Sequence, residues 1–401
     1  MSLTRHLNYL EIAHLSRVVV MAVEYRGDID HDALEQSFAL LCDACPALRA
    51  RASGSGTEML LTVDPEHRPN LVTLTCDTAD TSKVLAKLGE LPWDPTVSMA
   101  ELVLVPGEHH GFLALRVDHA IADGGAWLGL FRELLSLLSE IADGGTPTRV
   151  PGDSLPTPPA DIFHSRIGVI PYDRRLLYSV SPAEQVADDS PGVASGYIRL
   201  TEGETDWLRT SARRYGTSVH GLVCGAILAG QRAIGGGDEP AHMFCVSPVD
   251  FRDRLCPPVG DLETTNLMLS YLAEVEVSPH TSPVAIGQSI KTQLADAMST
   301  MTGVRGTAAP TAGQLDHNLM FALVSNLGVV DPLPQPSGMS LVDLHIVNTV
   351  EDTLFPGYYV YTYGGTLRIV YVLTSRFFSP AIVESLTREI REQLLIAGAS
   401  S

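Results

Sequence analysis

The pattern of apolar and polar positions in the first half of the chain switches between two periods. Apolar residues alternate or run together at residues 17–25 and 111–117, which predicts strands, whereas those within residues 32–45 share one helical face. Pro46 ends that helix because its backbone nitrogen has no proton to donate. Further strands are predicted at residues 58–63, 71–75 and 101–105, and helices at residues 82–88 and 126–141. We therefore expect helices that cover a sheet, an α/β fold of the α+β type.

The second half of the chain shows the same mixture of periods. Strands are predicted at residues 196–200, 243–249, 267–276, 319–325 and 341–348, and helices at residues 202–215, 218–234, 284–298 and 379–395. Residues 358–373 predict a hairpin that turns at Gly364-Gly365. Residues 146–159 are rich in proline, which favours a connection between domains. We predict an N-terminal domain at residues 1–178, with residues 145–178 as its connecting segment, and a C-terminal domain at residues 179–401.

Composition narrows the class of protein. The chain has 401 residues, which favours two domains, and its 45% hydrophobic residues can supply two cores. The formal net charge of -20 argues against nucleic acid and anionic membrane surfaces as partners. We expect no membrane span, because no apolar run is long enough, and no secretory signal. The six scattered cysteines favour a cytoplasmic location.

The most informative local pattern follows the strand predicted at residues 111–117. His119 lies at the end of that strand, Asp123 follows four residues later, and Gly124-Gly125 precede a predicted helix. A histidine at such a corner is well placed to act as a general base. The backbone N–H groups of Gly124 and Gly125, at the start of the helix, are candidate donors to an oxyanion. A motif this short needs independent support.

A second pattern, far downstream, fits the same chemistry. Residues 250–255 read Asp-Phe-Arg-Asp-Arg-Leu, directly after a predicted strand. The guanidinium group of Arg252 has the donor geometry to bind a carboxylate, and we predict that it pairs with Asp123. This pairing would turn Asp123 away from His119 and fix the corner. The alternative is that both residues are solvated surface charges.

These two patterns together resemble the condensation-domain superfamily. It includes peptide-synthetase condensation domains, plant acyltransferases and stand-alone polyketide-associated acyltransferases of the phthiocerol/phthiodiolone dimycocerosyl transferase type. Three further segments agree with the resemblance, in the order expected: residues 26–51, residues 91–94 (Leu-Pro-Trp-Asp) and residues 324–328 (Val-Ser-Asn-Leu-Gly). The last segment is similar to the stand-alone polyketide-associated branch.

The resemblance implies two chloramphenicol-acetyltransferase-like domains in a V, with an active-site tunnel between them. In this scheme His119 is the base, Asp123 is structural, and Arg252 comes from the other half. Ser325 and Asn326 are candidate substrate-binding residues. One departure is Asp118, which stands where many relatives have another histidine and is a possible influence on the pKa of His119.

The resemblance also implies an O-acyltransferase that uses an acyl thioester. The net charge of -20 disfavours docking of a carrier protein, which is typically acidic, so we expect acyl-CoA rather than an acyl carrier protein as donor, with acetyl as the first expectation. The acceptor would be the hydroxyl of a polyketide-like or lipophilic metabolite. Two alternatives stay open: an amide-forming condensation enzyme with a carrier-bound donor, and a non-catalytic binding domain. No metal or bound cofactor is expected, because motifs for zinc, nucleotides and serine hydrolysis are missing from the sequence. A monomer is expected, because two tandem halves can form one site.

Overall fold

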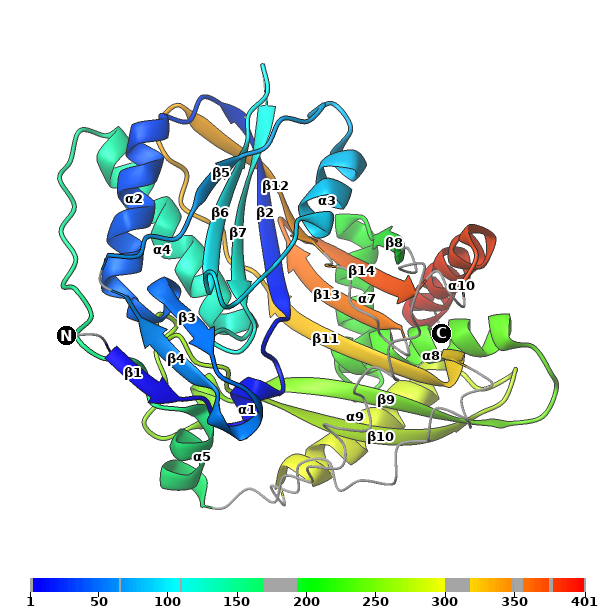
Figure 1. The fold of residues 1–401 in the computed structure, drawn as a ribbon. Coiled ribbons are helices and arrows are strands. Elements are labelled where there is room, and N and C mark those ends of the chain that lie inside the picture. Colours follow the sequence, from blue (N-terminus) through cyan, green and yellow to red (C-terminus); the bar gives the residue numbers. More distant parts are fainter. Residues whose placement is uncertain are drawn as a thin grey trace. The chain divides into compact units, whose positions relative to one another are not determined.

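The computed structural model describes residues 3–64, 66–108, 110–168, 193–299, 318–347, 349, 356–374 and 378–399 (Figure 1). The chain divides into two compact units, each made of three segments. Unit 1 comprises Met1–Val169, Asp250–Met268 and Asp331–Thr349, and unit 2 comprises Ile170–Val249, Leu269–Val330 and Val350–Ser401. The predicted boundary between residues 178 and 179 lies outside the described residues. Two segments that the sequence analysis placed in the second half, around Arg252 and at residues 331–349, belong to unit 1.

Unit 1 is built on a five-stranded sheet. Its strand order is β12 (Met339–Val347), β2 (Val18–Gly27), β7 (His110–Asp118), β6 (Ala100–Val105) and β5 (Leu71–Thr73). The long antiparallel pair β2–β7 runs from the Val18–Asp118 partners to the Arg26–His110 partners, so it brings the ends of both strands together at the corner that follows Asp118. A smaller sheet contains β1 (Leu3–His6), β4 (Leu60–Val63) and β3 (Ala50–Ser53).

The helices of unit 1 bury the apolar faces that their sequences predict. The helices α2 (His31–Ala44) and α4 (Gly124–Ala142) pack on each other, and α3 (Thr81–Glu90) contributes Val84 and Leu88 to an apolar cluster that also contains Val20 and Ala22 of β2. Among the described residues of unit 1, the other helices are α1 (Tyr9–Ile12) and α5 (Pro159–Ile167), with 3-10 turns at Pro46–Arg49, Gly56–Glu58 and Arg252–Arg254. The predictions of a helix at residues 32–45, ended by Pro46, and at residues 126–141 are confirmed.

Unit 2 is built on a six-stranded sheet. Its order is β10 (Met268–Val277), β9 (Ala241–Asp250), β11 (Phe321–Val329), β13 (Gly357–Tyr363), β14 (Thr366–Thr374) and β8 (Val193–Arg199). The β13–β14 hairpin turns at Gly364-Gly365, as predicted, and both glycines have positive φ angles. Because β11 runs parallel to β9 and β13, the sheet is mixed, and the α/β class is confirmed.

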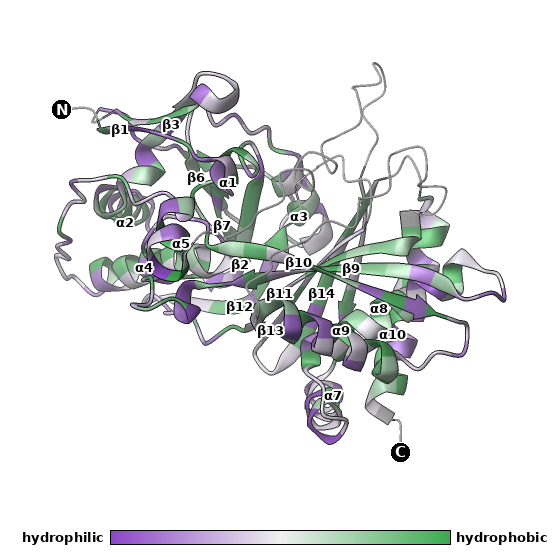
Figure 2. Ribbon diagram, turned by 90° about the horizontal axis from the view of Figure 1, so that it is seen from below, coloured by the Kyte–Doolittle hydropathy of each residue, from purple (hydrophilic) through white to green (hydrophobic). Residues whose placement is uncertain are grey.

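The core of unit 2 includes its sheet and the helix α8 (Val219–Gly235), together with apolar residues of the neighbouring helices. This apolar helix packs between α9 (Pro283–Ser299) and α10 (Pro380–Ala399), whereas α7 (Glu202–Arg214) is mostly hydrophilic (Figure 2). A Cβ on Gly225 would lie 2.0 Å from the backbone oxygen of Pro283, so α8 and α9 approach too closely for a side chain.

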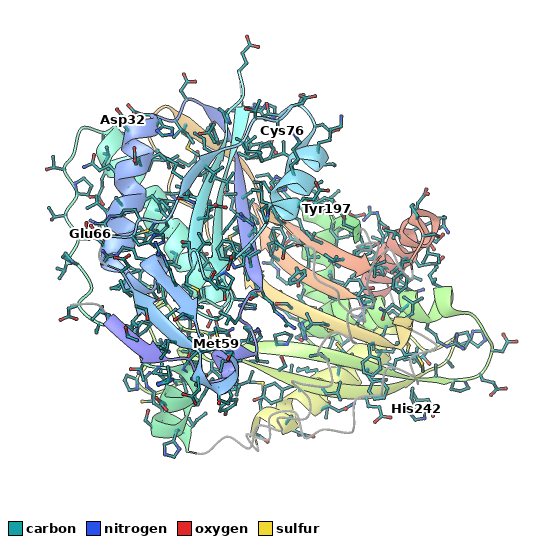
Figure 3. The ribbon with its side chains drawn as sticks, in the orientation of Figure 1. Asp32, Met59, Glu66, Cys76, Tyr197 and His242 are labelled. Carbon is teal, nitrogen blue, oxygen red and sulfur yellow. The ribbon has the colours of Figure 1, made fainter. Side chains whose placement is uncertain are left out.

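Exposed polar side chains of the two units include those of Asp32, Glu66 and His242 (Figure 3). Among the described residues, no helix has both the length and the apolar character needed to cross a membrane.

Candidate active site

The corner after β7 is closed by a buried carboxylate. Asp118 accepts hydrogen bonds from the Trp93 side chain at 2.8 Å, from the Ser16 backbone at 3.1 Å and from the Ala120 backbone at 3.0 Å. The backbone N–H of the next residue, His119, donates to the Arg17 carbonyl at 2.7 Å. Asp118, which stands where the resemblance would place a histidine, therefore ties the corner to the segment that precedes β2. The carboxylate that influences the pKa of His119 is Asp123.

The ring of His119 is held by a backbone carbonyl. Its Nδ1 lies 2.7 Å from the oxygen of Ala122, and because a carbonyl only accepts, Nδ1 must carry the proton. The neutral ring then has a lone pair at Nε2. No described residue donates a hydrogen bond to this atom. Burial lowers the pKa of His119, and it outweighs the opposing effects of the Ala122 carbonyl and the Asp123 carboxylate. The side chain is thus a neutral imidazole at neutral pH, the form that can accept a proton.

Asp123 begins α4 and points its carboxylate into the protein. One oxygen accepts from the Ala126 N–H at 2.8 Å and from Arg252 Nε at 2.8 Å, and the other accepts from the Leu267 N–H at 2.7 Å. The ion pair expected from the sequence is present, and both side chains are about 2–3% exposed. These donors occupy both oxygens of Asp123 and bind its carboxylate into the corner.

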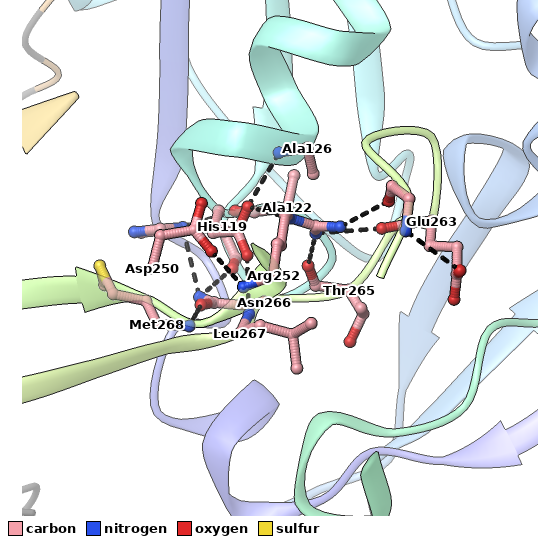
Figure 4. Close-up of polar contacts among 12 residues, drawn as sticks. His119, Ala122, Ala126, Asp250, Arg252, Glu263, Thr265, Asn266, Leu267 and Met268 are labelled. Carbon is pink, nitrogen blue, oxygen red and sulfur yellow. Dashed lines mark hydrogen bonds and ion pairs between the residues drawn. The ribbon is translucent and has the colours of Figure 1, made fainter. Parts of the chain in front are cut away.

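Arg252 organises the loop that faces the corner. Besides Asp123, its guanidinium group donates to the carbonyls of Gly260 at 2.8 Å, Glu263 at 3.1 Å and Thr265 (Figure 4). The next residue, Asn266, donates to the carbonyl of His119 at 2.9 Å. The sequence alone does not identify Asn266 as a site residue, because no local pattern shows that its amide will reach a backbone carbonyl so far away in the chain.

The first turn of α4 presents unpaired N–H groups. No described residue accepts a hydrogen bond from the N–H of Gly124 or Gly125. A Cβ on Gly125 would lie 2.6 Å from Oδ2 of Asp250 and 3.1 Å from Cδ of Arg252, so the second glycine allows this loop to pack closely. Asp250 itself is affected by this packing. Burial of the Asp250 carboxyl group, together with the nearby charge of Asp123, raises the pKa of Asp250 to about 6.

Ser325 and Asn326 belong to β11 of unit 2, and both are half-buried. The Asn326 side chain accepts from the N–H of Gly328 at 2.8 Å, at a bulge where the pairing with β13 shifts. This contact gives Asn326 a role in the local backbone conformation. The substrate-binding role of both residues stays a prediction.

A second histidine, which the sequence analysis missed, lies beside His119. The ring of His14 is centred 4.7 Å from that of His119, with the two planes inclined at 55°. His14 follows the short helix α1 in a segment without a clear apolar period, so no sequence signal identified it. A group that could hold a metal, His31, Asp32 and Glu35, also occurs among the described residues, but all three are exposed and such groups are common without an ion.

Comparisons with known proteins identify relatives of this chain and structures that share its fold. The family model "Phthiocerol/phthiodiolone dimycocerosyl transferase C-terminus" matches residues 189–372. The phthiocerol/phthiodiolone dimycocerosyl transferase of Mycobacterium leprae is 29% identical over 296 residues, which cover 68% of this chain and 69% of the relative. The enzyme of the same name from Mycobacterium ulcerans is 27% identical over 337 residues, 80% of this chain and 79% of the relative.

Solved structures share the fold across nearly the whole chain. Polyketide synthase associated protein 5 from Mycobacterium tuberculosis matches with a TM-score of 0.77 and 22% identity over 99% of this chain and 98% of the other. The trichothecene 15-O-acetyltransferase of Fusarium sporotrichioides matches with a TM-score of 0.70 and 12% identity over 99% and 96%. The first condensation domain of the CDA synthetase matches with a TM-score of 0.69 and 13% identity over 98% and 96%.

Proposed function

We propose that this chain, an acyltransferase with the condensation-domain fold and a relative of the phthiocerol/phthiodiolone dimycocerosyl transferases, forms esters on hydroxyl groups of lipophilic, polyketide-like acceptors. The donor is an acyl thioester, with acyl-CoA favoured over an acyl carrier protein and acetyl as the first acyl group to test. The observation that carries the proposal is the fixed tautomer of His119, whose Nδ1 binds the Ala122 carbonyl and whose Nε2 is available as a base.

The chemistry follows from that tautomer. Nε2 of His119 takes the proton of the acceptor hydroxyl while its oxygen forms a bond to the thioester carbonyl carbon, and the carbonyl electron pair moves to oxygen. The C–S bond then breaks, the carbonyl re-forms, and the imidazolium returns the proton to the leaving thiolate. The unpaired N–H groups of Gly124 and Gly125 are suited to bind the transient oxyanion.

The other site residues support this base without reacting. The Asp123–Arg252 pair and Asn266 hold the corner and the facing loop. No metal ion or resident cofactor takes part in this scheme. We further propose that the protein acts as a monomer in the cytoplasm. The cytoplasmic location is supported by the six cysteines, none of which forms a disulfide.

The test is release of free thiol from acetyl-CoA and longer acyl-CoAs with pooled hydroxylated polyketides as acceptors. Acceptor-dependent release by the wild type, lost in His119→Ala, is the expected result. Release from a carrier-bound donor with an amine acceptor would favour the amide-forming alternative. Equal background release by both proteins with every donor would overturn the proposal in favour of a non-catalytic binding domain.

A further inference from the structure

The contact between His14 and His119 is built into the N-terminal segment. The N–H of Ser16 donates to Asp118 at 3.1 Å, and the carbonyl of Arg17 accepts from the His119 N–H at 2.7 Å. These two bonds fasten the residues after His14 to both sides of the corner. Ser16 has a φ of 69°, the left-handed conformation that a tight turn requires. His14 is therefore held at a defined place beside the base.

The helix before His14 is anchored just as firmly. Glu11 of α1 is fully buried, binds Arg5 through two oxygens at 2.6 and 2.9 Å, and closes a capping box with Asn8. A buried carboxylate in a bidentate pair is a costly arrangement for a four-residue helix. Its effect is to fix the path of the chain into the turn that carries His14.

The ring of His14 lacks the partner that a buried imidazole normally has. Its Nδ1 is buried without a hydrogen-bond partner, and no described residue bonds to its Nε2. The pKa of His14 is well below its ordinary value, because of burial first and then the positive charges of His119 and Arg17. A neutral imidazole has one N–H donor and one acceptor. If the proton of His14 is on Nε2, the buried Nδ1 carries only a lone pair, and the N–H at Nε2 is available as a donor.

We propose that His14 is a second catalytic residue, whose ring N–H donates a hydrogen bond to the carbonyl oxygen of the acyl thioester and to the oxyanion that replaces it. This inference rests on the function proposed above. A carbonyl carbon attacked by a hydroxyl bound to His119 lies within reach of the neighbouring ring, since the two rings are in contact. His14 gives up no proton in this role. It supplies a side-chain donor in addition to the backbone donors of Gly124 and Gly125.

Three substitutions separate the donor from the bulk of the ring. His14→Phe keeps an aromatic ring and removes the donor, His14→Gln places an amide N–H near the position of Nε2, and His14→Asn places one near Nδ1. We expect His14→Phe to lower kcat by about 10²–10³-fold, the range for loss of one oxyanion donor, with little change in KM or melting temperature. His14→Gln should recover part of the loss and His14→Asn should not. His220→Phe, in unit 2, is the matched control and should retain kcat.

A spectroscopic readout tests the proposal without turnover. In the wild type, the ketone analogue of acetyl-CoA, with carbon in place of sulfur, should bind with its C=O stretch shifted to lower frequency, and His14→Phe should lose that shift. An unchanged stretch, or wild-type kcat in His14→Phe, overturns the role of His14. If His14→Phe unfolds, the C=O stretch of the bound analogue is compared between His14→Gln and His14→Asn. Equal frequencies in these two variants would overturn the role of His14. Full activity in His119→Ala would instead overturn the proposed function.

Discussion

Each unit contains a half-buried histidine beside the start of its long apolar helix, His119 before α4 and His220 within the first turn of α8. Burial lowers the pKa of both, to about 4 for His220. Their partners differ. His119 binds a backbone carbonyl through Nδ1 and leaves Nε2 open, whereas Nε2 of His220 lies 2.9 Å from Oγ of Ser247 and 3.4 Å from Sγ of Cys224.

The comparison teaches that burial alone does not leave a histidine with a ring nitrogen that is available to act as a base. A carbonyl fixes the tautomer and keeps the second nitrogen available, while a hydroxyl at Nε2 occupies the atom that would otherwise take a proton. A pKa of about 4 also makes His220 a weak base at neutral pH. We therefore interpret His220 as a packing residue of unit 2.

The largest expected effect tests this contrast directly. His119→Ala should lower the rate of thiol release by about 10²–10⁴-fold, the usual contribution of a positioned general base. His220→Ala should change it by less than about threefold, on the order of an ordinary neighbouring packing change. Both variants are measured with the same acyl-CoA and acceptor. Comparable losses of activity in His119→Ala and His220→Ala would mean that the hydrogen-bond partners of the two rings do not determine their roles.

Two arginine–carboxylate pairs extend the comparison to charge. Arg252→Ala leaves Asp123 buried without its charged partner and should cost about 3–5 kcal/mol of stability, with loss of activity. Arg391→Ala in unit 2 removes a pair with Glu204 that is partly exposed, so about 0–1 kcal/mol is expected. Urea unfolding curves measure both. Arg252→Lys should restore little, because an ammonium cannot reproduce the four contacts; full restoration would show that charge alone suffices.

The pH dependence separates activity from stability. Because the pKa of His119 is lowered, kcat/KM should stay level down to pH values below 6.5 and then fall as the ring takes up a proton. For His220 the unfolded chain binds a proton below about 6.5 and the folded chain only below about 4. Stability should therefore decrease as the pH falls through this window. Melting temperatures of the wild type and His220→Phe check this, and an equal decrease in both would contradict it.

Alanine substitutions at two glycines, one in each unit, are expected to have smaller effects on activity than the loss of His119. Gly125→Ala should displace the Asp250 side chain and lower activity by roughly tenfold, on the order of a small misplacement of the site, with little loss of stability. Gly225→Ala forces a methyl group against the Pro283 backbone and should cost about 1–3 kcal/mol without a matching change in kcat. Thiol release and thermal melting distinguish the two. A large stability loss in Gly125→Ala would mean that the loop cannot shift.

Much of the corner could be predicted because its signals are local. The strand before His119 and the helix after it each have a characteristic pattern over a few residues, although Gly124 and Gly125 are the first two residues of α4 and do not form a separate turn before it. The Arg252–Asp123 pair is a long-range contact, and it was predicted only because opposite charges followed two predicted strand ends.

What the sequence did not predict is the choice of distant partners. The period of residues 341–348 predicts a strand correctly, but it does not show that β12 joins β2 of unit 1. His14 and Asn266 reach the corner through backbone turns and single hydrogen bonds, which have no period. Alternation identifies a face of a strand, and it contains no information about which edge will pair with it.

The pairing of β12 with β2 also has a consequence for biosynthesis. The edge of β2 leaves the ribosome first, and its partner is made about 310 residues later, because Met339 lies opposite Gly27. At about 5–20 residues per second, the nascent chain keeps that edge unpaired for tens of seconds. An open edge of apolar sequence is a template for aggregation, so chaperone demand during expression should be set by this strand.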